Sequence, residues 1–151
     1  MDVEKIVREY IAKTPHLSLG TSHDNKPRVC EVNFIYDDAL NLYFISGKDS
    51  SHAIEVAHNP AVAGSIVMQH DKAAPPRGIY FEGSAYQFVD PSPDQIQNYA
   101  RQHGRDEKSL QAMLGSGEYT MYVIRVSVWF AFGDFGNGKT QKYSLEWGAV
   151  S

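Results

Sequence analysis

Residues 44–60 read Phe-Ile-Ser-Gly-Lys-Asp-Ser-Ser-His-Ala-Ile-Glu-Val-Ala-His-Asn-Pro. The end of an apolar strand is followed by a loop rich in hydroxyl groups, and then by a short helix that Asn59-Pro60 ends. The first turn of a helix has unpaired backbone N–H groups and the positive end of the helix dipole. This stretch therefore predicts a place where a phosphate group can bind.

The side chains of this loop allow two interpretations. Ser50 and Ser51 offer hydroxyl donors to an anion, and Lys48 and His52 offer positive charge. The simpler interpretation is that Asp49 and the two serines only compete to cap the helix. The local pattern alone leaves both interpretations open.

Strand patterns dominate the rest of the chain. Alternating apolar residues predict strands from residue 17 onward, and the longest strand-like stretches are 78–90 and 119–132, with Gly83 as a bend or bulge. The second strand is predicted to carry Cys30, Val32, Phe34 and Tyr36 on one face, and residues 139–147 can return as a last strand. Short helices are predicted over the first dozen residues with Asp2 as N-cap, over 92–104 from a capping box to Gly104, and over 106–114. About six strands, joined mostly by turns or short helices, favour an antiparallel barrel over a doubly wound sheet. The predicted class is mainly β (α+β).

Length and composition fit one domain over residues 1–151, with 42% hydrophobic and 21% charged residues. A net charge of −4 argues against a nucleic-acid or anionic-membrane surface. The single cysteine, Cys30, excludes an internal disulfide and fits a reducing compartment. No signal peptide or membrane-spanning run stands out, so the expected location is cytoplasmic.

No motif for catalysis by side chains stands out. The six histidines form no metal-binding signature, and no nucleophile elbow, Walker loop or dinucleotide fingerprint is present. Cys30 lies among apolar strand residues and is interpreted as a packing residue rather than a nucleophile. No catalytic residue and no metal site are predicted, so a cofactor would have to supply any chemistry.

Several segments, in their order and spacing, carry a resemblance to a known family. They are Lys26-Pro-Arg-Val29, Leu42-Tyr-Phe-Ile-Ser46, Ser50-Ser-His-Ala53, Asn59-Pro-Ala-Val-Ala63 and Arg77-Gly-Ile-Tyr-Phe-Glu-Gly83. Together they resemble the pyridoxamine 5′-phosphate oxidase-like, FMN-binding split β-barrel superfamily over roughly residues 14–132. The chain is especially similar to a small branch in which histidine replaces the lysine of the loop motif.

The resemblance implies a six-stranded antiparallel split β-barrel flanked by short helices, and a homodimer with two FMN sites at the subunit interface. It implies that FMN meets residues of three segments, the last partly from the second subunit. These residues are Arg28, Val29, Cys30 and Asn33; Phe44, Ile45, Ser46, Ser50, Ser51 and His52; and Arg77.

The chain also departs from the family pattern. Ser51 and His52 stand where the family has arginine and lysine, and Gly78 stands where it has glutamine. The arginine–histidine pair that grips pyridoxal phosphate has no match, which argues against a pyridoxamine phosphate oxidase in the strict sense.

The leading hypothesis is an FMN-dependent oxidoreductase acting on a small substrate, with a nicotinamide as a candidate reductant. Deazaflavin in place of FMN, a haem-binding or haem-degrading protein with His16, His70 or His103 as ligand, and a non-enzymatic dimeric barrel without cofactor remain open.

Overall fold

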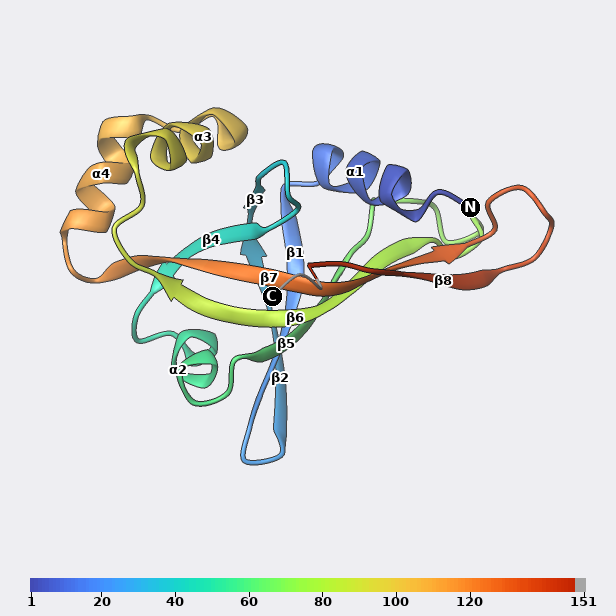
Figure 1. The fold of residues 1–151 in the computed structure, drawn as a ribbon, viewed down its shortest axis with the longest axis horizontal. Helices are drawn as coiled ribbons and strands as arrows, with labels where there is room; N and C mark the ends of the chain where they lie inside the picture. Colours follow the sequence, from blue (N-terminus) through green and yellow to red (C-terminus); the bar gives the residue numbers. More distant parts are fainter. Residues whose placement is uncertain (149–151) are drawn as a thin grey trace.

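A single antiparallel sheet, strongly curled, forms the body of the molecule (Figure 1). The structure is a computed structural model and describes residues 1–148. Its strands are β1 (His16–His23), β2 (Lys26–Asn33), β3 (Ile35–Tyr36), β4 (Leu42–Gly47), β5 (Ala61–Ile66), β6 (Gly78–Phe88), β7 (Tyr119–Gly133) and β8 (Gln141–Glu146). Its helices are α1 (Val3–Lys13), α2 (Ser51–His58), α3 (Pro93–His103) and α4 (Glu107–Gly115).

The strand order is β2-β1-β5-β6-β7-β4-β3, and β8 pairs with β7 beside this path. Every pair is antiparallel, as the short connections predict. The register of β6 on β7 shifts between Glu82 and Gly83, which confirms the bulge predicted at that glycine. A Cβ atom on Gly83 would lie 2.3 Å from the carbonyl oxygen of Arg125, so only glycine lets the two strands approach here.

The mainly β class and the half-barrel form are confirmed, with eight strands instead of about six. One added strand arises because the expected second strand breaks at Phe34, whose N–H bonds the carbonyl of Pro15. The two residues after this break pair with β4 instead of β1 and form β3. The other added strand is β8, at the place where residues 139–147 are expected to return along the sheet.

The helix ends follow their predicted caps. Asp2 accepts a hydrogen bond from Lys5 N at 3.0 Å at the start of α1. Ser92 and Gln95 make both bonds of the capping box at α3, and Gly104 ends that helix in the left-handed conformation with φ of 59°. These local signals place α1 and α3 independently of tertiary packing.

Two groups of buried apolar side chains hold the sheet and helices together. The larger one joins α1 and α2 to the concave sheet and includes Trp129 and Phe81, whose rings meet edge to face with centroids 5.6 Å apart. The smaller one packs α3 and α4 on β3, β4 and the start of β7. In residues 1–148, no helix has both the length and the apolar character that a membrane span needs.

Candidate cofactor site

The turn between β4 and α2 brings three polar side chains together. Ser50 is the N-cap of α2: its Oγ accepts a hydrogen bond from Ala53 N at 3.3 Å and donates one to Gly47 O at 2.8 Å. Ser46 Oγ lies 3.3 Å from Ser50 Oγ and 2.5 Å from His52 Nε2. The capping interpretation is therefore correct for Ser50, and the cap is at the same time one wall of a polar cluster formed by Ser46, Ser50 and His52.

The surroundings of His52 favour the neutral form of its side chain. Burial lowers the pKa of its imidazole below the usual 6.5, and the negative charge of Glu55 opposes that shift in part. Its ring also lies beside Phe44, with centroids 6.1 Å apart. A neutral imidazole at the positive end of a helix can bind an anion through a hydrogen bond, and gains a charge only by taking up a proton.

Ser51 differs from Ser50 in that its hydroxyl is exposed and makes no hydrogen bond within residues 1–148. The N–H groups of Ser51 and His52 belong to the first turn of α2, where a helix has no acceptor of its own for them. Two backbone donors and one hydroxyl are thus available beside the cluster. Asp49 is exposed and does not cap the helix.

Arg28 does not join this cluster. Its Nε lies 2.8 Å from Oε1 of Glu55, a carboxylate on α2 whose side chain is only 8% exposed. The geometry is that of a charge pair without a directed hydrogen bond, since Oε1 has no hydrogen-bond partner of its own. The other oxygen of Glu55 accepts a hydrogen bond from Thr21 Oγ1 at 3.2 Å. The pair ties α2 to the β1–β2 hairpin.

Sequence reasoning missed Glu55. The sequence held a signal for it, because Glu55 lies three positions after His52 and therefore on the same side of the helix as that residue. The buried residues of α2 are Ala53, Glu55 and Val56. An acidic residue on the buried side of a short helix requires a partner, and Arg28 is that partner.

The remaining predicted residues of β2 lie along an open edge. Among the described strands β2 pairs only with β1, so its other edge has free backbone groups. Val29 is 73% exposed and Asn33 is exposed, while Cys30 is half-buried. Burial and the neighbouring carboxylates of Glu31 and Glu55 raise the pKa of the Cys30 thiol, in keeping with a packing role.

The β4 residues present a second open edge. Phe44 is fully buried and stacks on Tyr122 with centroids 5.1 Å apart, so only its backbone can meet a ligand. In the described structure β3 pairs with β4 only at Leu42 and Tyr43, so the backbone of Phe44, Ile45 and Ser46 has no strand partner opposite β7. Because β2 and β4 come into contact as the sheet curls, the two open edges lie on either side of the split in the barrel.

Arg77 lies at the other end of the sheet. It precedes Gly78, which pairs with Phe132, whereas Ser46 pairs with Thr120, twelve residues away on β7. At roughly 3.3 Å per residue this is about 40 Å along the strand. Within one chain the predicted residues other than Arg77 thus lie on β2, on β4 and at the start of α2, of which Ser46, Ser50 and His52 are in mutual contact, and Arg77 lies apart from them.

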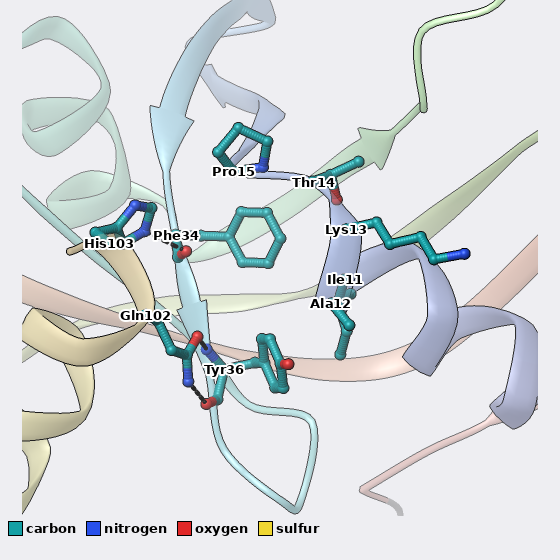
Figure 2. Close-up of a pocket in the computed structure, with 9 residues that line it drawn as sticks. All are labelled: Ile11, Ala12, Lys13, Thr14, Pro15, Phe34, Tyr36, Gln102 and His103. Carbon is teal, nitrogen blue, oxygen red and sulfur yellow. Dashed lines mark hydrogen bonds between the residues drawn. The ribbon is translucent and has the colours of Figure 1, made fainter.

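A cavity of about 320 Å³ lies between the end of α1, the β2–β3 junction and the end of α3 (Figure 2). The polar side chains that α3 contributes to it are already bound to the backbone of neighbouring residues. Gln102 accepts from Tyr36 N at 3.2 Å and donates to Tyr36 O at 2.9 Å, and His103 Nε2 lies 2.6 Å from Phe34 O. These hydrogen bonds hold α3 against β3, so the cavity offers few free groups to a ligand. Within residues 1–148, no group of three or more His, Cys, Asp or Glu side chains is placed to bind a metal ion.

Comparison with solved structures shows which known fold the chain shares. No protein-family model and no curated protein sequence matches the chain. Among solved structures, ChuZ from Campylobacter jejuni is similar with a TM-score of 0.77 and 18% identity, over 95% of this chain and 59% of ChuZ. The chain thus spans about three fifths of the length of ChuZ.

Two further structures match over nearly their whole length. HutZ, the haem storage protein from Vibrio cholerae, is similar with a TM-score of 0.66 and 14% identity, over 98% of this chain and 96% of HutZ. A Listeria innocua protein provisionally named a pyridoxamine 5′-phosphate oxidase has a TM-score of 0.65 and 20% identity, over 86% of this chain and 98% of its own. The chain has the split-barrel fold of pyridoxamine 5′-phosphate oxidase-like proteins, as its sequence segments predict.

Proposed function

We propose that the protein binds FMN as a homodimer and acts as a flavin-dependent oxidoreductase on a small substrate. The observation that carries the proposal is the cluster of Ser46, Ser50 and His52 at the N-terminus of α2. It lies beside free backbone donors and next to the split between β2 and β4. The Listeria innocua protein that shares this fold supports the proposal only because it is provisionally named a pyridoxamine 5′-phosphate oxidase.

Ser46, Ser50, Ser51 and His52 offer donors that fit a phosphate group but carry no permanent charge, and Lys48 in the same turn is exposed to solvent. Ser51 contributes a free hydroxyl, and α2 contributes N–H groups and the dipole. The hydroxyls of Ser46 and Ser50 lie next to these donors and contact each other. Arg28 is already paired with Glu55, so it supplies no uncompensated charge. His52 therefore has to take up a proton to balance a phosphate, and affinity for FMN falls as the pH rises and that proton is lost.

The open edges of β2 and β4 would hold the ring system. Between Val29 and Asn33, the backbone groups that face away from β1 are free to bond the edge of an isoalloxazine. When bound, a flavin supplies hydride transfer, and a nicotinamide is a suitable reductant. The task of this chain is then to bind and orient the cofactor, with no side chain needed as a general acid or base.

The homodimer is part of the proposal because the split site is open on one side. The outer sheet face around Val29 has a shallow hollow lined by small residues such as Gly20 and Ala63, and by the aromatic rings of Tyr80 and Phe130. A second copy of the chain would cover this face. It would also bring its own Arg77 to the site, as the family resemblance implies.

The test compares FMN with riboflavin, which lacks the phosphate, by titration of flavin fluorescence. We expect Ser51→Ala to lower FMN affinity about three- to tenfold while riboflavin affinity and folding stability stay unchanged, because its hydroxyl is free in the protein. Ser50→Ala removes both a helix cap and the wall of the site. Its matched control is Ser92→Ala, which removes the cap of α3 on another part of the molecule (Figure 1).

Both cap variants should lose about 1 kcal/mol of stability, and only Ser50→Ala should weaken FMN binding. Equal affinity for FMN and riboflavin in the wild type, or FMN affinity unchanged in Ser50→Ala with Ser51→Ala, would refute the phosphate site. A protein that takes up no FMN at all refutes the proposed function.

Haem binding is the second candidate, favoured by the likeness to HutZ and by one cavity. This cavity of about 740 Å³ is lined by His16 and His70, two of the three histidines considered as haem ligands. The third, His103, already bonds the carbonyl oxygen of Phe34 through its Nε2. A Soret band on addition of haemin, lost in His70→Ala, would support this candidate, and the absence of both flavin and haem binding would leave the cofactor-free barrel.

A further inference from the structure

A cavity of about 440 Å³ lies where the loop between β5 and β6 passes α1 and the start of the β7–β8 turn. Its size is that of a small-molecule site. It is lined by Tyr10, Met68, His70, Pro76, Arg77 and Asp134, among others. None of these residues belongs to the cluster at α2, which lies at the other end of β6 and β7.

Arg77 gives this cavity a permanent positive charge, and no ion pair among residues 1–148 balances that charge. The guanidinium lies over the ring of Phe135 at 4.4 Å from the centroid, which fixes its position. Within residues 1–148 it forms no ion pair. The nearby Asp134 turns its Oδ1 to its own loop, where it accepts hydrogen bonds from Gly136 N at 3.0 Å and Gly138 N at 3.1 Å.

Tyr10 provides a second polar group without a protein partner. The residue is only 3% exposed, lines the cavity from α1, and its hydroxyl makes no hydrogen bond to the described residues. The hydroxyl is not one of the fully buried unpaired polar atoms of residues 1–148, so it is accessible from the cavity and can donate a hydrogen bond to a ligand or water there. Burial raises the pKa of Tyr10, and the positive charge of Arg77 opposes that shift.

The other walls restrict the ligand further. Met68, Ala74, Pro75 and Pro76 give the cavity an apolar side, and His70 donates its Nδ1–H to Asp71 O at 2.9 Å. One fixed cation, one phenol donor and an apolar wall match an anion with an apolar body. We propose that this cavity binds a small organic carboxylate, held by the guanidinium of Arg77 and the hydroxyl of Tyr10.

Benzoate and its neutral isostere benzamide are the probes, titrated by calorimetry on the full chain. We expect benzoate to bind about tenfold more tightly than benzamide in the wild type, since a charge-assisted bond to Arg77 is available only to the anion. Arg77→Met should abolish that preference. The matched control Arg105→Met removes an exposed arginine elsewhere and should retain it. Tyr10→Phe keeps the packing of α1 and should weaken benzoate about three- to tenfold.

Equal binding of the two probes in the wild type, or a benzoate preference that survives Arg77→Met, overturns the proposal. FMN affinity is measured on the same variants, because the resemblance also assigns Arg77 to the flavin of a second subunit. The two proposals use different ligands, so either can fail while the other stands. A loss of FMN affinity in Arg77→Met with the benzoate preference retained counts against the carboxylate site.

Discussion

The pair between Arg28 and Glu55 allows a sharp test of how α2 is held on the sheet. Arg28→Met removes the cation and leaves the carboxylate of Glu55 buried, with the hydroxyl of Thr21 as its remaining partner. Glu55→Gln removes the negative charge, keeps an acceptor for Thr21, and leaves Arg28 free to be solvated, since its side chain is 60% exposed. The two halves of one ion pair should therefore have unequal costs.

Loss of one partner of a fully buried pair costs about 3–5 kcal/mol. Exposure of the arginine screens this pair, so we expect about 2 kcal/mol for Arg28→Met and about 0.5–1 kcal/mol for Glu55→Gln. The double variant should resemble Glu55→Gln and be more stable than Arg28→Met by about 1 kcal/mol, because no stranded carboxylate remains. At about 2–4 °C per kcal/mol, Arg28→Met should lower Tm by about 4–8 °C.

Urea unfolding followed by the fluorescence of the buried Trp129 measures all three free energies of unfolding. The control is Arg8→Met, which breaks the pair with Glu4 on α1 and an exposed hydrogen bond to Asp38 O, and the side chains of Arg8 and Glu4 are both more than 40% exposed. That loss should stay below about 0.5 kcal/mol. If Glu55→Gln costs as much as Arg28→Met, or if Arg28→Met costs no more than Arg8→Met, the reasoning is wrong.

Two further predictions concern pH and packing. Because burial lowers the pKa of His52 below 6.5, the unfolded chain binds more protons than the folded one as the pH falls below 6.5. The stability that depends on neutral His52 is thus fully present above pH 6.5 and is lost as the pH falls toward its lowered pKa. His52→Gln should flatten this part of the unfolding free energy plotted against pH, and an unchanged slope would contradict the assignment. Gly64→Ala should cost about 1–3 kcal/mol in urea unfolding, because its Cβ would lie 2.4 Å from the ring of Phe81 and 2.6 Å from Ser18 O. Gly115→Ala on α4 meets open space and should gain about 0.5 kcal/mol; similar effects of the two changes would show that the close approach at Gly64 is not real.

Local chemistry was readable from the sequence wherever a residue acts on its own neighbours. The caps at Asp2 and Ser92 and the left-handed Gly104 depend on hydrogen bonds within four residues, so sequence alone located α1 and α3. The helix after the 44–60 loop and its polar start were predictable for the same reason. The resemblance in segment order then indicated the split barrel, which the structure and its solved neighbours have.

Contacts between distant segments were not readable in this way. The pairing of Arg28 with Glu55 joins residues 27 positions apart, and the unpaired edges of β2 and β4 exist only because the whole sheet curls. Arg77 was grouped with the loop residues by the resemblance, whereas strand register separates the two by about 40 Å measured along β7 within one chain.

The sequence by itself thus determined the helix starts, the bulge at Gly83 and the hydroxyl-rich loop, because short-range hydrogen bonds and backbone sterics act wherever the chain goes. Only the tertiary structure decided that the pKa of His52 is lowered and that the loop's nearest arginine is already paired. Burial and long-range charge pairing set both properties, and these depend on which distant residues the fold brings together.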